Sequence, residues 1–273
     1  MIKKMKIFNL KKIVIILYII PIFSFIFSCN SSPKIAFYKR VIQNSETKID
    51  FNKDSINFYR EGLKLLKEEN YEEALYYFDE AIKLNDKFAR VYNSKGNALS
   101  NLKKYDEAIS FYDEAINIDK DNPLFYNSKG EALIKQNNIK EAIECFNMAV
   151  KKDRFFVNSY YNLANAFIIL GDFNKAIDYA NKSISLSKKE PDGYFYKARA
   201  LDTMGNKEQA LKEYDNAINY NKRYINALYY KMILLLELSR RDEATIYLNK
   251  LIEIDSKKEE YYNKIFNLSS DTE

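Results

Sequence analysis

The chain contains no histidine among its 273 residues. Without histidine it cannot form Ser-His-Asp triads, Cys-His pairs or histidine-ligated metal sites. It also has only six glycines, and no glycine-rich phosphate-binding loop occurs among them. We therefore expect no metal, no cofactor and no enzymatic activity.

Cysteine is nearly absent as well, since Cys29 and Cys145 are the only two. If Cys29 carries a lipid, as argued below, Cys145 has no partner for an intrachain disulfide. Cys145 precedes an inward-facing ring in the helical pattern described below. It is therefore interpreted as an ordinary helix residue rather than as a nucleophile.

The chain lacks a net charge once its first residues are set aside. The whole chain has 43 Lys and Arg against 38 Asp and Glu, but residues 1–28 contain five lysines and no acidic residue. Residues 29–273 therefore carry 38 charges of each sign. Nothing remains that favours binding to a phosphate backbone, so nucleic acid is not an expected partner.

An apolar run from Ile13 to Phe27 follows the five lysines, which is the order of regions in a signal peptide. As a helix, its 15 residues span about 22 Å, less than the roughly 30 Å hydrocarbon core of a membrane. Pro21 also interrupts the run. The N-terminus is thus better suited to export than to spanning a bilayer.

The run ends in Ile26-Phe27-Ser28-Cys29, which resembles the cleavage box of bacterial lipoproteins. The resemblance implies that residues 1–28 are a lipoprotein signal peptide and that Cys29 becomes the lipidated N-terminus. An uncleaved signal anchor is the alternative. Either way, the rest of the chain is expected in the bacterial cell envelope as a membrane-anchored protein, with the periplasmic and cell-surface sides both open.

Residues 29–54 are predicted to be the lipidated cysteine and a flexible tether. From Asn30 to Asp54 the sequence is polar, mixed in charge and without helical periodicity. Such a tether has an r.m.s. reach of about 25–30 Å if fully disordered.

One pattern of 34 residues fills residues 55–258 without insertion. Its six copies, numbered here as units one to six with positions 1 to 34, each carry an alanine at position 20. The units are residues 55–88, 89–122, 123–156, 157–190, 191–224 and 225–258. The alanines are Ala74, Ala108, Ala142, Ala176, Ala210 and Ala244. Because one such unit can bury its apolar face only against its neighbours, the repeat predicts a helical solenoid.

Spacings of three and four residues place positions 4, 8 and 11 on one helical face and positions 20, 24 and 27 on another. A turn with Gly, Asn or Asp separates the two helices, as in Gly171-Asp172, and Asn or Asp there can cap the second helix. Small residues at positions 8 and 20 should allow a close approach of the two helices, with the large ring at position 4 or 24 filling the adjacent gap.

This pattern resembles the tetratricopeptide repeat (TPR) family, which has small residues at positions 8, 20 and 27 and bulky ones at 4, 11 and 24. The resemblance implies an all-α fold, a right-handed α-solenoid of six helix-turn-helix units. Residues 259–273 are expected to form a capping helix and tail, with Tyr262, Ile265 and Phe266 facing inward. Two departures are plain: position 32 never carries the family's proline, and position 4 carries Tyr, Phe or Leu in place of tryptophan.

In TPR proteins the first helix of each unit lines a concave groove, which here places positions 5 and 9 in a peptide-binding row. We expect exposed side-chain amides to hold the backbone of an extended peptide, since each amide is both donor and acceptor. The alternative is that the asparagines reflect codon bias on a solvated face. The predicted groove residues are Asn93, Asn97, Asn127, Glu131, Tyr161, Asn165, Phe195 and Arg199.

The sequence therefore favours a membrane-anchored scaffold or adaptor that binds a protein or an extended peptide in the cell envelope. A surface-exposed lipoprotein that contacts host molecules is the second interpretation. An enzyme or a glycan-binding protein is the third.

Overall fold

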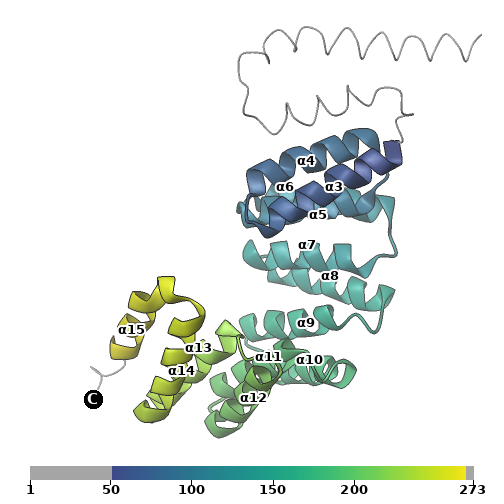
Figure 1. Cartoon of the computed structure of the whole chain (residues 1–273). Coiled ribbons are helices and arrows are strands. Elements are labelled where there is room, and N and C mark those ends of the chain that lie inside the picture. The colour runs from purple at the N-terminus through teal and green to yellow at the C-terminus, as the bar shows by residue number, and fades with distance from the viewer. Residues whose placement is uncertain (1–50, 269–273) are drawn as a thin grey trace, which may run out of the picture. The chain divides into compact units, whose positions relative to one another are not determined.

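The computed structural model describes residues 51–268, which form helices and contain no strand. The helices follow one another as pairs, and a final helix covers the end (Figure 1). The first helices of the pairs are α3 (Phe51–Lys67), α5 (Ala89–Asn101), α7 (Pro123–Lys135), α9 (Val157–Ile169), α11 (Pro191–Thr203) and α13 (Ile225–Glu237). The second helices are α4 (Tyr71–Leu84), α6 (Tyr105–Ile118), α8 (Ile139–Lys152), α10 (Phe173–Leu186), α12 (Lys207–Tyr220) and α14 (Arg241–Ile254).

The helices repeat with the 34-residue period of the sequence, which confirms an all-α solenoid of helix pairs. From unit two onward, each first helix begins at position 1 of its unit. Helix α3 begins earlier, at Phe51, so the last residues of the predicted tether belong to a helix. Asp54 in its first turn suits the positive end of the helix dipole. The predicted signal peptide 1–28, Cys29, the predicted tether up to residue 50 and the predicted tail 269–273 lie outside the described residues.

The two helices of a unit meet where position 8 is small. A Cβ atom added to Gly130 would lie 2.5 Å from a ring carbon of Phe146, which stands at position 24. Phe146 and the adjacent Ala142 are both buried. The ring therefore occupies the space that a larger residue at position 8 would need, as the sequence predicted. The same approach recurs between Gly62 and Phe78 and between Gly96 and Tyr112.

The turn between paired helices contains a left-handed residue at position 15 of every unit. The backbone N–H of the next residue then bonds back to position 11, as from Lys104 to the carbonyl of Leu99 at 2.9 Å. This is the geometry of a Schellman-type helix end. The left-handed residues are Glu69 (φ 60°), Lys103 (62°), Asn137 (68°), Gly171 (78°), Gly205 (81°) and Ser239 (57°).

The predicted side-chain cap of the second helix is confirmed only in unit four. There the Asp172 carboxylate accepts a bond from the backbone N–H of Lys175 at 3.2 Å. The side chains of Asn70, Asn138 and Asn206 make no such bond.

Lys103→Gly should raise the free energy of unfolding by about 1 kcal/mol, because a left-handed residue with a Cβ is strained by roughly that amount. Gly171→Ala should lower it by about the same amount, since a Cβ there meets no other atom and only backbone strain acts. Urea unfolding measures both. Glu144→Gly, at an exposed position in the middle of α8, is the control and should lose about 0.5–1 kcal/mol. A loss in Lys103→Gly would contradict the argument.

In units two to five, the tyrosine at position 4 links the two departures from the family pattern. The Tyr92 hydroxyl donates to the backbone carbonyl of Asp86 at 3.1 Å, and Asp86 stands at position 32 of the preceding unit. The tyrosine thus ties down a loop that has no proline to stiffen it. It stays half-buried because its hydroxyl reaches the loop. The same bond joins Tyr126 to Lys120, Tyr160 to Arg154 and Tyr194 to Lys188.

Ion pairs link several units. Lys129, at position 7 of unit three, pairs with Asp113 of unit two at 2.6 Å between nitrogen and oxygen. Such a pair holds the first helix of one unit against the second helix of the unit before it. The equivalent pairs are Lys95 with Asp79 and Lys231 with Asp215.

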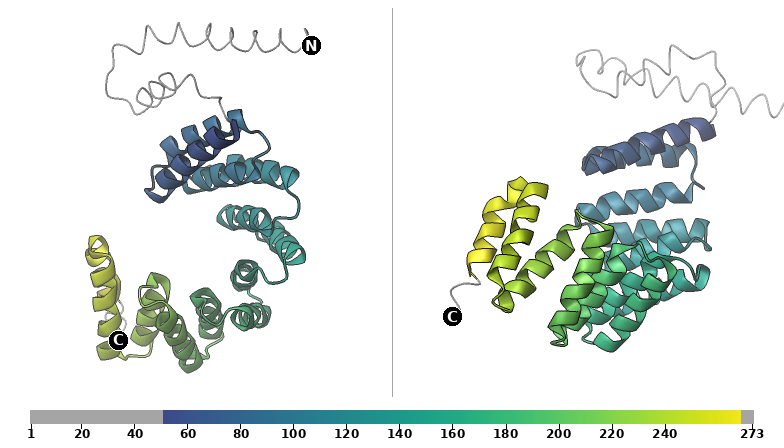
Figure 2. Two further views of the ribbon diagram at one scale, coloured as in Figure 1. Left: turned by 45° about the vertical axis from the view of Figure 1, so that its right-hand side comes forward. Right: turned by 60° about the horizontal axis from the view of Figure 1, so that its bottom comes forward.

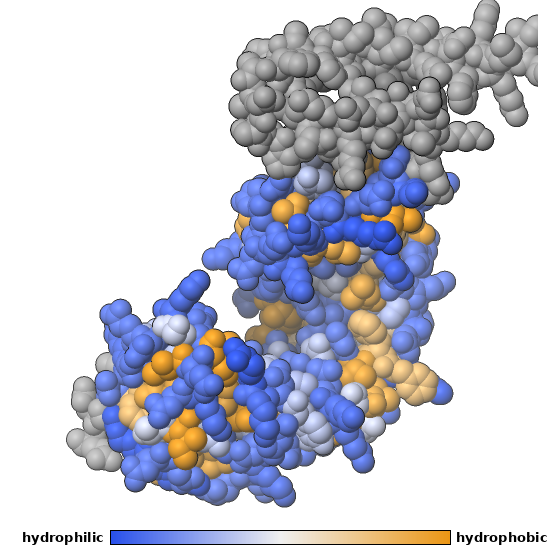
Figure 3. All heavy atoms as spheres, in the orientation of Figure 1, coloured by the Kyte–Doolittle hydropathy of each residue, from blue (hydrophilic) through white to orange (hydrophobic). Residues whose placement is uncertain are grey.

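Helix α15 (Glu259–Leu268) follows a short 3-10 turn, η1 (Ser256–Lys258), and covers the apolar face of unit six. Tyr262 and Phe266 are buried, and Ile265 packs against the same cluster, which confirms the predicted cap. Among the helices of residues 51–268, none has the length and apolar character needed to cross a membrane. Figure 3 shows a mostly hydrophilic surface on this side, with hydrophobic groups over α13 to α15.

Candidate functional site

The first helices of successive units form one continuous face. Each odd-numbered helix from α3 to α11 contacts the next odd-numbered helix as well as its own partner. The stack of helices is curved (Figure 2), and helices that approach one another lie on the inner side of such a curve. We call this surface, made by α3, α5, α7, α9, α11 and α13, the inner face.

The close approach of the first helices buries more of each helix than the sequence indicated. Position 10 is buried from unit two to unit six, although no apolar stripe was expected there. The reason is that a first helix packs against its own partner, the preceding unit and the next first helix at once. The residues concerned are Ala98, Ala132, Ala166, Ala200 and Leu234.

Asn127 is the centre of a buried hydrogen-bond network between α7 and α9. Its side-chain oxygen accepts bonds from the Ser159 hydroxyl and from the Asn162 amide, both at 3.0 Å. Its own amide nitrogen donates to Glu131 at 2.7 Å, and Asn162 donates to the same Glu131 oxygen at 2.9 Å. Asn127 is only 2% exposed. Its amide is therefore occupied, and it holds the exposed carboxylate of Glu131 in place.

The expectation of a row of exposed amides is wrong for Asn93 as well as for Asn127. Asn93 is 4% exposed, and its side-chain oxygen is buried with no hydrogen-bond partner among the described residues. Asn97 is half-buried and accepts a bond from the Tyr112 hydroxyl at 2.8 Å. Asn165 is half-buried on the inner face. Position 5 is buried in units two and three because the next first helix lies closer than the periodicity of a single helix indicates.

Phe195 is also buried rather than available as an apolar contact in a groove. Its ring lies 5.4 Å from that of Tyr224 and 5.7 Å from that of Tyr230, centroid to centroid. Arg199 is half-buried, and its guanidinium lies over the Tyr230 ring, 4.1 Å from the centroid. Tyr161 is half-buried and stacks on Tyr196 at 6.2 Å with an interplanar angle of 17°.

Carboxylates gather around this stacked pair. Burial, followed by the negative charges of Asp192, Glu131 and Glu190, raises the pKa of Tyr161. Burial, followed by Asp192 and Glu131, raises the pKa of Tyr196 to about 12. These groups come from α7, α9, α11 and the loop that precedes α11.

Tyr224 and Glu190 complete the group around Asp192. The Tyr224 hydroxyl donates to a carboxylate oxygen of Asp192 at 2.5 Å. The pKa of Glu190 is raised, first by burial of its carboxyl group. A hydrogen bond with Asp192 and the negative charge of Asp192 raise this pKa further. We call Tyr161, Tyr196, Tyr224, Glu131, Glu190 and Asp192 the tyrosine–carboxylate cluster. The sequence predicted only Tyr161 and Glu131 of this cluster, because the other members stand at positions 2, 6 and 34, outside the predicted row of positions 5 and 9.

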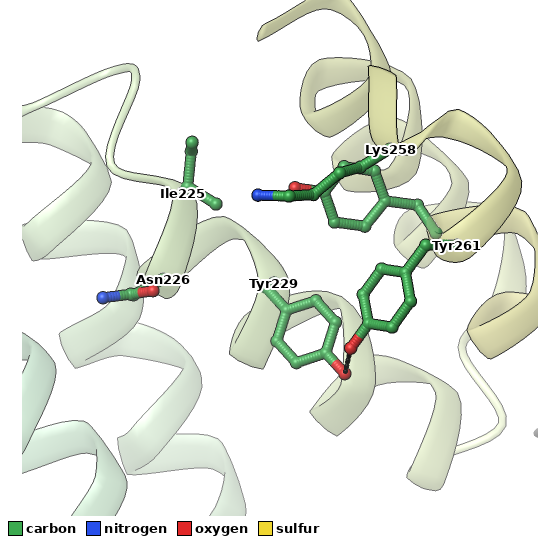
Figure 4. Close-up of a pocket in the computed structure, with 6 residues that line it drawn as sticks. Ile225, Asn226, Tyr229, Lys258 and Tyr261 are labelled. Atoms are coloured by element: carbon green, nitrogen blue, oxygen red, sulfur yellow. Dashed lines mark hydrogen bonds between the residues drawn. The ribbon is translucent and has the colours of Figure 1, made fainter. Parts of the chain in front are cut away.

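A pocket of about 470 Å³ lies between α13, η1 and α15 (Figure 4). The rings of Tyr229 and Tyr261 lie side by side, and their hydroxyl oxygens are 3.5 Å apart. Lys258 extends its amino group towards Ile225 and also pairs with Asp255 at 3.0 Å. Tyr262 and Asn226 complete the lining. The pocket has the size and apolar walls to take one large side chain.

Two observations on residues 51–268 concern metal ligation and thiol reactivity. Within residues 51–268, no group of His, Cys, Asp and Glu is arranged to hold a metal ion. Burial raises the pKa of the Cys145 thiol to about 11. This thiol is therefore protonated at neutral pH and is a poor nucleophile.

Three family models described as tetratricopeptide repeat match residues 89–122, 124–154 and 156–229. No curated protein matches the sequence. Among solved structures, the chain is similar to the crystal structure of the APC/C hetero-tetramer Cut9-Hcn1, with a TM-score of 0.69 and 16% identity. That match covers 79% of this chain and 43% of the other, so this chain spans less than half the length of that structure.

Two further structures have similar folds. Pseudomonas aeruginosa PilF has a TM-score of 0.62 and 19% identity, over 78% of this chain and 98% of that one. PilW, described as a widely conserved type IV pilus biogenesis factor, has a TM-score of 0.63 and 18% identity, over 73% of this chain and 92% of that one. At these identities the similarity concerns the fold alone.

Proposed function

The chain is a tetratricopeptide-repeat protein, and from this premise we propose that it is a membrane-anchored scaffold that binds a protein or an extended peptide on its inner face. Repeats of this family bind protein or peptide partners, which supports the binding role. One observation carries the choice of surface. The first helices of consecutive units contact one another, so side chains from several units lie next to each other on that face.

The partially exposed residues of the inner face are the proposed contacts. Glu131, Tyr161, Asn165 and Arg199 come from three consecutive units and keep part of their surface open. Asn97 and the pocket beside Tyr229 extend the same face towards the two ends. Asn93, Asn127 and Phe195 are not contacts in this proposal, since they are buried.

Site-specific photo-crosslinking in cells tests the proposed surface. A photoreactive residue in place of Asn165, on the inner face, should give a discrete crosslinked product with the partner. The same residue in place of Glu144, exposed on α8, is the matched control and should give none. A product from Glu144 alone would place the partner on the second helices and contradict the proposal.

The anchor is proposed to be lipid on Cys29, after removal of residues 1–28. The lysine-rich start, the apolar run and the Ile26-Phe27-Ser28-Cys29 box support this. Two or more acyl chains on one cysteine suffice for stable anchoring where one chain does not. The proposed location is the bacterial cell envelope, and protease treatment of intact cells distinguishes the periplasmic from the surface-exposed side.

Cys29→Ser should abolish labelling by radioactive fatty acid and leave an unprocessed precursor, because no thiol remains to be acylated at that position. Cys145→Ser is the matched control and should be labelled as the wild type is. Labelling that persists in Cys29→Ser would contradict a lipoprotein anchor.

A further inference from the structure

The tyrosine–carboxylate cluster differs from the other acidic positions on the solenoid. Where carboxylates stand between units, an internal lysine usually pairs with them, as Lys129 does with Asp113. Among residues 51–268, no lysine or arginine forms an ion pair with Glu131, Glu190 or Asp192. Arg199 is the nearby cation, and its guanidinium is already stacked on Tyr230. The cluster therefore carries negative charge that the chain itself does not neutralise.

The carboxylates of the cluster are held in position by hydrogen bonds. Asn127 and Asn162, both at least nine-tenths buried, donate to the same oxygen of Glu131. The Tyr224 hydroxyl donates to Asp192. Because these donors are themselves fixed in the core of the inner face, the two acids present their remaining oxygens without having to be ordered first. Preorganised acceptors of this kind lose less entropy when they bind a donor.

The rings of the cluster suit a flat cation. Tyr161 and Tyr196 stack on each other and keep part of their surface accessible, and the charges of Glu131 on α7 and Asp192 on α11 act on both rings. A cation over the face of an aromatic ring is attracted by the ring quadrupole. A guanidinium also binds carboxylates through two parallel bonds, which an ammonium cannot do. The contact between Arg199 and Tyr230 shows that the inner face accommodates such stacking.

We propose that the inner face of units three to five binds an arginine side chain of the partner, with its guanidinium against Tyr161 and Tyr196 and paired with Glu131 and Asp192. This inference rests on the proposed function and adds the chemistry of the partner, a basic extended peptide. Charge complementarity selects the occupant, since an acidic peptide would meet three carboxylates that have no counter-ion. The side chain would enter from solvent with its backbone lying along α7, α9 and α11.

A peptide-display selection on the full-length chain in nonionic detergent tests this inference. The probe is a library of random linear 12-residue peptides. The wild type should select peptides enriched in arginine at one position. The variant Glu131→Gln/Asp192→Asn should lose that enrichment, because the amides keep the shape and the hydrogen bonds but not the charge. The control Glu144→Gln/Asp178→Asn removes two exposed charges from α8 and α10 and should select as the wild type does.

A selected peptide then allows affinities to be compared by calorimetry. Changing its enriched arginine to glutamine should weaken binding to the wild type about tenfold or more, since charge-assisted bonds are lost. The same change should have little effect on binding to Glu131→Gln/Asp192→Asn. Circular dichroism at matched concentration checks that the variant is folded.

The outcomes separate this inference from the proposed function. Peptides selected without arginine enrichment would overturn the arginine site and leave peptide binding intact. Equal affinity for the arginine and lysine forms of the peptide would overturn the assignment of a guanidinium. No peptide above background, together with no crosslink from position 165, would overturn both the inference and the proposed function.

Discussion

Gly130→Leu should lower the free energy of unfolding by about 3 kcal/mol or more, because overpacking a close helix contact forces side chains and backbone apart. The first added carbon already lies 2.5 Å from a ring carbon of Phe146, and Phe146 is 1% exposed, so the ring has nowhere to move. Urea unfolding followed by circular dichroism measures the loss. Glu144→Leu, an exposed position on the partner helix α8, is the control and should change stability little.

A second pair of variants tests the cause of that loss. The three atoms nearest to a Cβ added at Gly130 all belong to the Phe146 ring, although unit five accommodates Ala198 opposite Tyr214 at the same two positions. Gly130→Ala should therefore lower the free energy of unfolding more in the wild type, where Phe146 is present, than in the Phe146→Ala variant. Equal effects in the two backgrounds would mean that the ring is not the obstacle.

Asn127→Ala should lower the free energy of unfolding by about 2–3 kcal/mol, since a buried polar group left without its partner costs about 1–3 kcal/mol. The Ser159 hydroxyl, which is fully buried, would lose its acceptor. The Asn162 amide would lose one of its two acceptors and keep Glu131. Asn93→Ala is the matched control at the same position of unit two. It removes an oxygen that has no partner among residues 51–268, so stability should be unchanged or slightly higher.

Thermal or urea unfolding measures the stability of Asn127→Ala and Asn93→Ala under the same conditions. A similar loss in both would show that burial rather than the network makes position 5 important. Replacing Asn127 would not test binding, because Asn127 supports the fold through its hydrogen bonds. Glu131→Gln and Asp192→Asn are better suited, since they remove charge from side chains that stay partly exposed.

The sequence predicted the solenoid and the contacts within each unit. Position 8 faces position 24 because both lie on stripes of one helix pair that are joined by a short turn, and 34-residue spacing repeats this contact in every unit. The capping helix could be predicted for the same reason, since Tyr262, Ile265 and Phe266 continue the apolar stripe. The left-handed residue at position 15 was visible only where it is Gly or Asn, and Lys103 and Ser239 gave no such signal.

The binding surface was predicted less well, because it depends on contacts between units. Helical periodicity places position 5 beside the core stripe of its own helix, but it does not say how near the next first helix lies. Asn93, Asn127 and Phe195 were therefore expected on the surface and are buried. Position 6 lies outside the predicted row, although it carries Tyr196 and Tyr230.

The sequence by itself determined the repeat, the helix pairs and the cap, since these follow from local periodicity and from side chains at most 34 residues apart. Only the tertiary structure decided which polar residues support the fold and which remain open to a partner. The two asparagines at position 5 of units two and three have nearly the same sequence neighbours. Yet one is the centre of a hydrogen-bond network and the other has an unpartnered oxygen. Ser159 and Asn162 on α9, the next first helix, make that difference, because a buried amide is satisfied only by the partners that packing brings to it.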